Sequence, residues 1–591
     1  MGKQRAGRLL SAFIAAAPAY EVVELLTAAD LPARLAGRAV DTFGPGASRL
    51  LRDDPWRLLQ LTGVDVPDAD ALARAAIPGV RPTDSRRCRA LVGHVLARTA
   101  RDGHTLTPLD QVEQELRLYR IADPAQAIAD ACASEQVHRV GAELALDRYF
   151  QAEQEIAAAV RRLERGAEPI RSRRAEVEPA GLDEVQRSAV DNVLAHGVSV
   201  LTGGPGTGKS RTVAAVVRAA EQAGKIVALA APTGRAAKRL AELCDVEAMT
   251  IHRLLGVQPR SGESGEVDFG AGFARGPDWP LDADLVVVDE ASMLDVELAA
   301  ALLRACADGT HLMLVGDSAQ LPSIGPGQVL ADVIGAGTVP VVELRRLYRQ
   351  DAGGAIARLA TAVRAGGLPP VDSPDREVVV VPARGSAECA RRVVQLVTDS
   401  IPRALGIDPG QIQVVTPVHR GPAGTIALNA ALKAELNPQP AGRAGSRFDP
   451  GDRVVATANH LEAAPTGFAN GEVGTVTRVS GRVVTIDFGT ETPAPAEVSG
   501  KMLADISHGW AITVHRAQGS EFAAVVVVLA PEASRMLSRP LVYTALTRAR
   551  LHLSVVHGSG PALARAVRDI GATPRRTMLA EALGKQPGRA E

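Results

Sequence analysis

The chain has few aromatic residues, few cysteines and no excess of charge of either sign. Aromatic residues make up 3% of the 591 residues, so side chains on which nucleic-acid bases could stack are scarce. The five cysteines lie far apart and include no C-x-x-C pair, which argues against a zinc site, an iron–sulfur cluster or a disulfide framework. The net charge of -1 gives no overall attraction to nucleic acid or membrane. Any contact with nucleic acid must therefore come from local basic positions.

Long apolar runs are also missing. None approaches the roughly 18 residues of a membrane-spanning helix, and we predict no membrane partner. The stretch Leu9 to Ala19 follows three basic residues and loosely imitates a secretion signal. Because Leu9, Phe13 and Ala17 share one face at helical spacing, we interpret this stretch as a helix instead.

The length of the chain predicts roughly three to five folding units. Residues 1–166 have apolar positions at helical spacing, which predicts a helical N-terminal domain, and the charged segment 167–180 is typical of a linker. Beyond it, β-branched runs alternate with helical stretches, which predicts α/β domains with buried parallel strands at 181–338 and 339–570. The expected strands are Val198–Leu201, Ile226–Ala230, Leu285–Val288 and His311–Val315, then Val339–Leu344, Val378–Val381, Ile412–Thr416, Val525–Leu529 and Leu551–Val556.

Two further segments differ in their sequence pattern from these α/β domains. About residues 447–497, short alternating strands are separated by glycine turns, which predicts a small β-barrel inserted in the second domain. The segment 571–591 has no clear periodicity, and we predict a flexible tail.

The strongest motif is the glycine-rich loop Gly203-Gly204-Pro205-Gly206-Thr207-Gly208-Lys209-Ser210, which fits the pattern G-x-x-x-x-G-K-[ST]. It follows an apolar strand and precedes a helical stretch, as a phosphate-binding loop requires. Lys209 is then expected to reach the β- and γ-phosphates, and the Ser210 hydroxyl to bind Mg²⁺. A glycine-rich turn that matches by chance is the alternative, although it would not explain the strand and the helix in register.

Two later strands end in polar residues that suit hydrolysis. Asp289 offers a carboxylate to Mg²⁺, and Glu290 beside it can orient or deprotonate a water molecule; helix capping is the alternative. Asp317 and Gln320 follow another apolar strand, at the edge where α/β sheets bind ligands. A solvated turn is the alternative for this second pair.

In this order, the motifs resemble those of superfamily 1 helicases, and most closely the RecD-like 5′-to-3′ DNA helicases. The similarity covers about residues 180 to 560. The further segments that carry it are Leu182–Gln186, Ala231–Leu240, Thr250–Gly256, Leu347–Gln350, Thr416–Thr425, Ala511–Phe522 and Val542–Arg550. The resemblance implies two tandem RecA-like P-loop NTPase domains, with a helical N-terminal domain and an inserted SH3-like β-barrel.

The resemblance also implies ATP and Mg²⁺ as cofactors and assigns residues to them. Gln186 would contact adenine, Gln320 would sense the γ-phosphate, and Arg349 and Arg548 would act as arginine fingers from the second domain. The catalytic set is Lys209, Asp289, Glu290, Gln320, Arg349 and Arg548. The ATP-binding set is Gln186, residues 203–210, Arg211 and Glu521, and the metal set is Ser210 and Asp289.

Single-stranded DNA is the partner that the resemblance implies, gripped by both α/β domains. The candidate contacts are Thr233, Arg235 and His252 in the first domain, and His419, Arg420, His515 and Gln518 in the second. Each of them could instead be solvated or serve as a structural partner. The segment about 257–280, with Phe269, Phe273 and Trp279, resembles the strand-separating pin of this family, and a flexible loop is the alternative.

The N-terminal region resembles the helix-hairpin-helix modules of RecD-like helicases, but its hairpin Gly63-Val64-Asp65 ends in a carboxylate that would repel phosphate. Gly44-Pro45-Gly46 is a second candidate hairpin. Binding of DNA by this region and a packing or protein-docking role both remain open.

We predict a cytoplasmic, monomeric, ATP-dependent DNA helicase that moves 5′ to 3′ on single-stranded DNA and on 5′-tailed duplexes in repair or recombination. Repair or recombination proteins are further candidate partners. The alternative is an ATP-gated DNA-binding or remodelling subunit of a larger nuclease or repair complex, with little unwinding of its own. The helicase half of a conjugative relaxase is disfavoured, because the twelve histidines include no His-x-His cluster.

Overall fold

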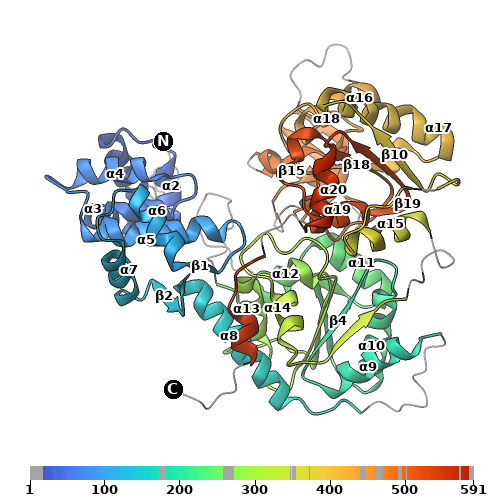
Figure 1. The fold of residues 1–591 in the computed structure, drawn as a ribbon, viewed down its shortest axis with the longest axis horizontal. Coiled ribbons are helices and arrows are strands. Elements are labelled where there is room, and N and C mark those ends of the chain that lie inside the picture. Colours follow the sequence, from blue (N-terminus) through green and yellow to red (C-terminus); the bar gives the residue numbers. More distant parts are fainter. Residues whose placement is uncertain are drawn as a thin grey trace, which may run out of the picture.

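The computed structural model describes residues 17–171, 181–256, 272–346, 348, 354–371, 373–438, 447–458, 460, 463, 467–468, 470–489, 495–500, 502–570 and 574–584. Figure 1 shows an N-terminal module of helices beside two α/β domains. Among the described residues, no helix is long and apolar enough to cross a membrane. The helix expected over Leu9 to Ala19 falls mostly outside the described residues, which are helical over 17–28.

The first α/β domain is built on a six-stranded parallel sheet with the order β6-β5-β7-β8-β4-β9. Its central strands are runs of valine and leucine buried on both faces, as expected for a sheet covered by helices on each side. The strands are β4 (Val198–Gly203), β5 (Val227–Ala231), β6 (Ala248–Thr250), β7 (Leu285–Val288), β8 (His311–Gly316) and β9 (Val341–Leu344). The predicted α/β class with parallel sheets is confirmed.

Two layers of helices cover this sheet. One face packs against α9 (Glu184–Ala195), α10 (Lys209–Gln222) and α11 (Gly234–Cys244). The other packs against α8 (Asp147–Gly166), α13 (Val296–Ala305) and α14 (Val329–Ala336). The short α12 (Ile251–Leu255) follows β6.

Two predicted boundaries of this domain are wrong. Strand β9 was expected to open the second domain, but it pairs with β4 in the first sheet. Helix α8 was expected to belong to the N-terminal domain, but its apolar face lies in the core of the first α/β domain, with Ile156, Val160 and Leu163 buried. The domain therefore extends at both ends beyond the predicted range 181–338.

The second α/β domain has a five-stranded parallel sheet with the order β10-β19-β18-β11-β17. Its strands are β10 (Val378–Pro382), β11 (Ile412–Thr416), β17 (Ala511–Thr513), β18 (Phe522–Leu529) and β19 (Ala549–His557). Its helices are α15 (Ala355–Arg364), α16 (Ser386–Gln395), α17 (Ile401–Leu405), α18 (Thr425–Leu436), α19 (Arg539–Leu546) and α20 (Pro561–Arg568). This arrangement agrees with the predicted pair of α/β domains in tandem.

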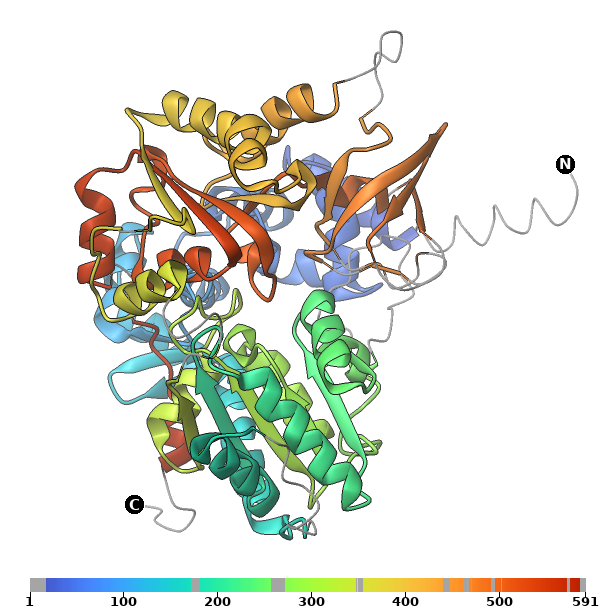
Figure 2. The same cartoon turned by 90° about the vertical axis from the view of Figure 1, so that its right-hand side faces the viewer.

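An antiparallel sheet is inserted in the second domain, and we call it the inserted sheet. Its order is β15-β14-β13-β12-β16, and it has its own apolar core around Phe448, Phe468 and Ile486. Its strands are β12 (Arg453–Ala456), β13 (Val473–Ser480), β14 (Val483–Asp487), β15 (Ala496–Ser499) and β16 (Ile506–His508). Figure 2 shows it standing at one side of the second domain, above α11. Sequence reasoning ended this unit at residue 497, before β16, and its closure into an SH3-like barrel stays a prediction.

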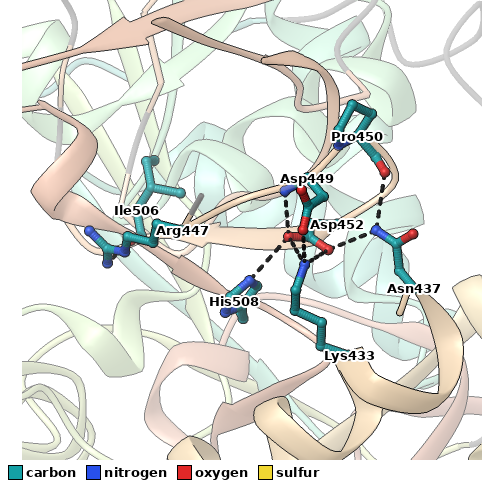
Figure 3. A network of polar contacts seen from close by, with 8 residues as sticks. All are labelled: Lys433, Asn437, Arg447, Asp449, Pro450, Asp452, Ile506 and His508. Atoms are coloured by element: carbon teal, nitrogen blue, oxygen red, sulfur yellow. Dashed lines mark hydrogen bonds and ion pairs between the residues drawn. The ribbon is translucent and has the colours of Figure 1, made fainter. Parts of the chain in front are cut away.

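A buried ion cluster joins the inserted sheet to α18 (Figure 3). The Lys433 ammonium donates to Asp452 at 2.6 Å and to Asp449 at 2.9 Å, and both carboxylates are almost fully buried. Burial alone would raise the pKa of Asp452, but hydrogen bonds from His508, Lys433 and Asn437 outweigh it and lower that pKa to about 2. The cluster therefore fixes the orientation of the inserted sheet while the Asp452 carboxylate stays ionised.

Replacing Lys433 with methionine should strongly destabilise the second domain, because it leaves two buried carboxylates without their cation. Breaking a buried pair costs about 3–5 kcal/mol, which corresponds to a fall of roughly 6–20 °C in the melting midpoint of a domain of this size. Calorimetry of the whole chain would measure the fall. The matched control is Lys225→Met, which removes the half-exposed pair with Asp284 and should cost less than about 1 kcal/mol. Equal shifts for the two variants would contradict the interpretation of the cluster.

The N-terminal module has a separate core around Trp56, whose indole N–H donates to Asp70 at 2.8 Å while Arg87 binds the same carboxylate. Its helices are α2 (Leu35–Phe43), α3 (Ala47–Asp53), α4 (Val66–Ala76), α5 (Ser85–Ala100), α6 (Leu109–Leu118) and α7 (Pro124–Ala133). The expectation of helices alone is incomplete, because β1 (Leu106–Pro108), β2 (Val137–Val140) and β3 (Glu143–Leu146) form an antiparallel sheet.

The two candidate hairpins of this module differ in local structure. Asp65 caps the N-terminus of α4, where its side chain accepts from the Asp68 N–H at 3.1 Å. The carboxylate that disfavours phosphate therefore has a structural reason to be there. Gly44 and Gly46 separate α2 from α3, and Gly44 has the positive φ of 75° that glycine tolerates.

The predicted flexible tail is wrong for the part that the structure describes. Helix α21 (Leu579–Gly584) packs against α8 and α14, with Leu579 and Leu583 buried. Apolar contacts with two helices of the first α/β domain hold this segment in place.

Candidate nucleotide and DNA site at the domain interface

The loop Gly203–Ser210, which we call the phosphate loop, joins β4 to α10. Gly206 and Gly208 have φ angles of 77° and 91°, which side-chain-bearing residues rarely adopt. The Thr207 hydroxyl donates to the Gly204 carbonyl at 2.7 Å, and the Tyr348 N–H donates to the Gly206 carbonyl at 2.8 Å. These bonds fix the loop in the shape that turns backbone N–H groups toward an anion at the start of α10.

Lys209 lies folded over this loop. Its ammonium donates to the carbonyls of Gly203 at 2.6 Å and Gly204 at 3.1 Å. Ser210 follows it in the first turn of α10 and is half-buried. A triphosphate in the loop would offer the ammonium stronger, charged acceptors than these two carbonyls.

Gln186 is fully buried at the first turn of α9, where it forms a reciprocal cap with Asp183. Its Oε1 accepts from the Asp183 N–H at 3.2 Å, whereas its Nε2 has no partner among the described residues. A Cβ at Gly208 would lie 2.4 Å from this Nε2, so the free donor faces the phosphate loop. A buried amide donor without a partner is costly, and a ring nitrogen of adenine would satisfy it.

Asp289 and Glu290 stand at the end of β7. The Asp289 carboxylate accepts from the Glu290 N–H at 2.8 Å, and Glu290 has a φ of 52°, an uncommon conformation for a residue with a side chain. Burial raises the pKa of Glu290, and the Asp289 charge raises it further, while Arg548 and Lys209 oppose the rise. Burial also raises the pKa of Asp289. A carboxylate with a raised pKa is a stronger general base.

Gln320 and Arg548 meet across the two α/β domains. Both are almost fully buried, and the Arg548 Nη2 donates to the Gln320 Oε1 at 3.0 Å. Arg548 also donates to the carbonyls of Thr544 at 2.9 Å and Ser520 at 3.1 Å, so the second domain fixes its direction. The guanidinium is therefore aimed at the residues that follow β7 and β8.

Three residues of this interface were missed as site residues, although the matching segments contain them. The Tyr543 hydroxyl donates to Asp317 at 2.7 Å, and the Thr544 hydroxyl accepts from the Leu321 N–H at 2.8 Å. Tyr348 donates its hydroxyl to Asp183, and its ring lies 3.4 Å from a Cβ placed at Gly208. All three residues lie in segments that resemble helicase motifs, and this resemblance could have marked them. No local sequence pattern shows, however, that a tyrosine side chain contacts the other domain.

Three further residues were predicted to take part in ATP binding or hydrolysis: Arg349, Arg211 and Glu521. Arg349 lies outside the described residues. Arg211 is exposed on α10 near Gly181. Glu521 pairs with Arg239 of α11 at 3.2 Å, and it therefore bridges the two α/β domains.

The candidate DNA residues of the first domain lie on or beside α11 and α12. Thr233 caps α11 by accepting from the Ala236 N–H at 3.3 Å. Arg235 stacks on Phe522 of the second domain at 5.0 Å, and its Nη1 has no hydrogen-bond partner among the described residues. His252 packs against Phe273, and burial lowers its pKa.

Three candidate residues of the second domain form one group, and the fourth lies elsewhere. His419 and Arg420 are exposed, and His419 shares a hydrogen bond of 3.0 Å with Thr425. Burial lowers the pKa of the half-buried His515, and the nearby charges of Arg575 and His419 lower it further. Gln518 is buried instead and donates to the Leu321 carbonyl at 2.9 Å. In this arrangement Gln518 joins the two domains and does not face solvent.

Most of the pin-like segment lies outside the described residues. Of its aromatic residues, Phe269 falls there, Phe273 packs on His252, and Trp279 is exposed with Arg275 stacked on it at 4.0 Å. A strand-separating role for this segment stays a prediction.

Comparison with known proteins decides the family. Residues 16–106 match the family model "ATP-dependent RecD2 DNA helicase HHH domain", residues 181–380 an AAA domain and residues 508–556 a UvrD-like helicase C-terminal domain. The chain is 35% identical over 548 residues to the ATP-dependent RecD2 DNA helicase of Deinococcus radiodurans, covering 87% of this chain and 71% of that protein. This chain belongs to the RecD2 helicase family. It is therefore an ATP-dependent DNA helicase and a hydrolase.

Other relatives of this RecD2 family member differ in coverage. The RecBCD enzyme subunit RecD of Mycobacterium tuberculosis is 34% identical over 72% of this chain and 79% of its own length. The conjugal transfer protein TraA of Rhizobium radiobacter is 27% identical over 64% of this chain but only 32% of its own length. The predicted resemblance to RecD-like helicases is confirmed, including its N-terminal helix-hairpin-helix part.

Proposed function

We propose that this helicase moves 5′ to 3′ along single-stranded DNA and unwinds duplexes that carry a 5′ tail. Membership in the RecD2 family supports the direction, and the hydrogen bond between Arg548 and Gln320 is the observation that carries the ATP-driven movement. Because this bond joins the two α/β domains beside the phosphate loop, the bound nucleotide would control how the domains meet.

ATP would bind between the phosphate loop and the segment after β9. The free Nε2 of Gln186 and the ring of Tyr348 lie on the same side of Gly208 and would contact the adenine. Lys209 would exchange its two carbonyl acceptors for the β- and γ-phosphates. The adenine base would thus bind a donor that has no partner among the described residues of this structure, and the phosphates would replace the two carbonyl acceptors of Lys209.

Magnesium would be held by Ser210 and Asp289 together with the phosphates. Within the described ranges, no three His, Cys, Asp or Glu side chains form a metal site. A hydroxyl and a carboxylate beside a phosphate loop fit Mg²⁺, which prefers few protein ligands and keeps several waters. Glu290 would accept a proton from the attacking water, as its raised pKa allows.

Hydrolysis would be coupled to movement through the stretch that follows β8. Gln320 would meet the γ-phosphate, and Arg548 would turn part of its guanidinium toward the same phosphate. Loss of the γ-phosphate would weaken this joint contact and let the domains separate. Alternating closure and opening of two domains that both hold one strand produces stepping.

The single DNA strand would contact side chains of both α/β domains. His419, Arg420 and His515 would hold it on the second domain. Thr233, Arg235 and His252 are the candidates on the first, where the unpaired Nη1 of Arg235 offers a donor to a phosphate. Grip on both domains is the condition for stepping.

A strand-displacement assay with tailed duplexes tests the direction of movement. With ATP and Mg²⁺, we expect unwinding of a duplex with a 5′ tail, and none of the same duplex with a 3′ tail. A blunt duplex and a reaction with a non-hydrolysable ATP analogue are the controls. Preference for the 3′ tail would overturn the proposed direction.

A second candidate function is an ATP-gated subunit that serves a larger complex. The similarity to the RecD subunit of the RecBCD enzyme over 79% of that protein favours it. The same assay separates the two candidates. An ATP-gated subunit would show ATPase activity stimulated by single-stranded DNA but no strand displacement by the isolated chain.

A further inference from the structure

The segment after α20 leaves the second α/β domain and returns to the other end of the molecule. The Arg539 N–H still binds the Ile570 carbonyl at 2.7 Å within the second domain. From residue 574 onward, the chain lies against the N-terminal module and the first α/β domain. Figure 1 and Figure 2 show this red segment ending beside the helices of the first domain. We call residues 574–584 the C-terminal clasp.

Arg575 of the clasp binds the loop 323–327, which follows Gln320. Its Nη1 donates to the Ser323 hydroxyl at 2.9 Å and to the carbonyls of Gly325 at 2.9 Å and Gly327 at 2.5 Å. Its Nη2 donates to the Ser323 carbonyl at 2.6 Å. One planar guanidinium therefore contacts three carbonyl groups of a five-residue loop, with the two Nη1 hydrogens shared among three acceptors, and its charge strengthens the set.

The loop 323–327 also has no room to move toward α13. A Cβ at Gly325 would lie 2.5 Å from the Asp295 carboxylate, and one at Gly327 would lie 2.2 Å from Val296. The glycines let the loop lie directly on the start of α13, while Arg575 binds its carbonyl groups. The loop is thus immobilised between α13 and the clasp.

The position of Arg575 is set by the N-terminal module and α8. The Arg576 carbonyl accepts from the N–H groups of Thr105 at 3.0 Å and Leu106 at 3.1 Å. The Met578 N–H donates to Glu153 of α8 at 2.9 Å. Movement of the second domain therefore need not move Arg575.

The stretch 317–327 is consequently held at both ends by different parts of the protein. At its start, the second domain contacts Asp317, Gln320 and Leu321. At its end, Arg575 contacts residues 323–327. Gln320 therefore lies between contacts with the second domain, which change when the domains move, and the loop 323–327, which Arg575 keeps in place.

We propose that Arg575 is a positioning residue for ATP hydrolysis. By fixing the loop 323–327, it holds Gln320 where the γ-phosphate and Arg548 can meet it together. This inference rests on the proposed role of Gln320 as the γ-phosphate sensor. Arg575 would act through this loop and not on the nucleotide itself.

The test is the ATPase activity of Arg575→Ala at saturating single-stranded DNA, which removes any effect through the neighbouring His515. We expect kcat to fall roughly 10- to 100-fold, because small displacements of a catalytic group have effects of this size. KM for ATP should stay within about twofold, since the phosphate loop and the proposed adenine contacts are unchanged. Guanidinium ion added in solution should restore part of the lost kcat.

Two control variants distinguish the positioning of Gln320 by Arg575 from a general loss of packing of the clasp. Arg576→Ala removes only a half-exposed ion pair with Glu143. Arg161→Ala removes a hydrogen bond of 2.8 Å to the Ala582 carbonyl, at the far end of the clasp from Arg575. Both should keep kcat. An equal loss in either control, or an unchanged kcat in Arg575→Ala, would overturn the proposal.

A double-mutant cycle shows whether Arg575 acts through Gln320. If it does, Arg575→Ala should lower kcat no further in a Gln320→Ala background. Additive losses would overturn the proposal. A Gln320→Ala variant with normal kcat would instead refute the proposed sensor role, whatever Arg575 does. If Arg575→Ala does not fold, Arg575→Lys decides by the same measurements, because an ammonium cannot reproduce the planar fork.

Discussion

Replacing Arg548 with alanine is expected to lower the DNA-stimulated ATPase kcat by about 10³- to 10⁵-fold, the range measured for arginine fingers in other NTPases. The guanidinium is the buried cation that links the second domain to Gln320, and its charge is felt at Glu290. Steady-state ATP hydrolysis with single-stranded DNA would measure the loss. ATP affinity should change much less, because the phosphate loop is intact.

Arg550 provides the matched control for this variant. It lies two residues further along the same segment and is exposed, so Arg550→Ala should keep most of the activity. Arg548→Lys should remain strongly impaired, since lysine keeps the charge but not the planar fork. A loss below about tenfold in Arg548→Ala, which is less than 1.4 kcal/mol of barrier, would refute the assignment.

The second large effect is expected for Lys209→Ala, which should abolish measurable ATP hydrolysis and strand displacement. Removing one preorganised donor from a reacting centre typically costs about 10²- to 10³-fold in kcat, and here the donor is a full cation on the transferred phosphate. Binding to single-stranded DNA without nucleotide should persist, because the candidate DNA residues belong to other elements. Filter binding and ATPase assays on the same preparation would measure both.

Arg218→Ala is the control for Lys209→Ala, because Arg218 is an exposed basic residue of the same helix. It should leave both activities intact. Hydrolysis that survives in Lys209→Ala would show that the phosphate loop is not the site of turnover.

The sequence predicted the backbone geometry of the phosphate loop well, because that geometry is local. A strand, a glycine-rich loop and a helix follow one another within residues 198–222, and positive φ angles fall on Gly206 and Gly208 as the motif requires. The carboxylates Asp289 and Glu290 likewise follow directly from the end of β7. In short-range patterns of this kind, the residues that form the site are neighbours in the sequence, so the pattern alone predicts how they lie in the structure.

Several of the failures concern contacts between distant parts of the chain. A run such as Val341–Leu344 looks the same in either sheet, and only its pairing with β4 shows where it belongs. Gln518 has a polar side chain in a DNA-related segment, yet its partner is the Leu321 carbonyl. Arg575 lies in a segment without periodicity, and its acceptors are about 250 residues away, where no sequence pattern connects them.

The joint between the clasp and the N-terminal module has a consequence for synthesis on the ribosome. Thr105 and its acceptor Arg576 are 471 residues apart. At about 5–20 residues per second, translation needs roughly half a minute to a minute and a half to cover that distance. During this interval the N–H groups of Thr105 and Leu106 lack their final acceptor, and α8 lacks the apolar cover that α21 supplies. A nascent chain therefore completes this joint only after both α/β domains have been translated.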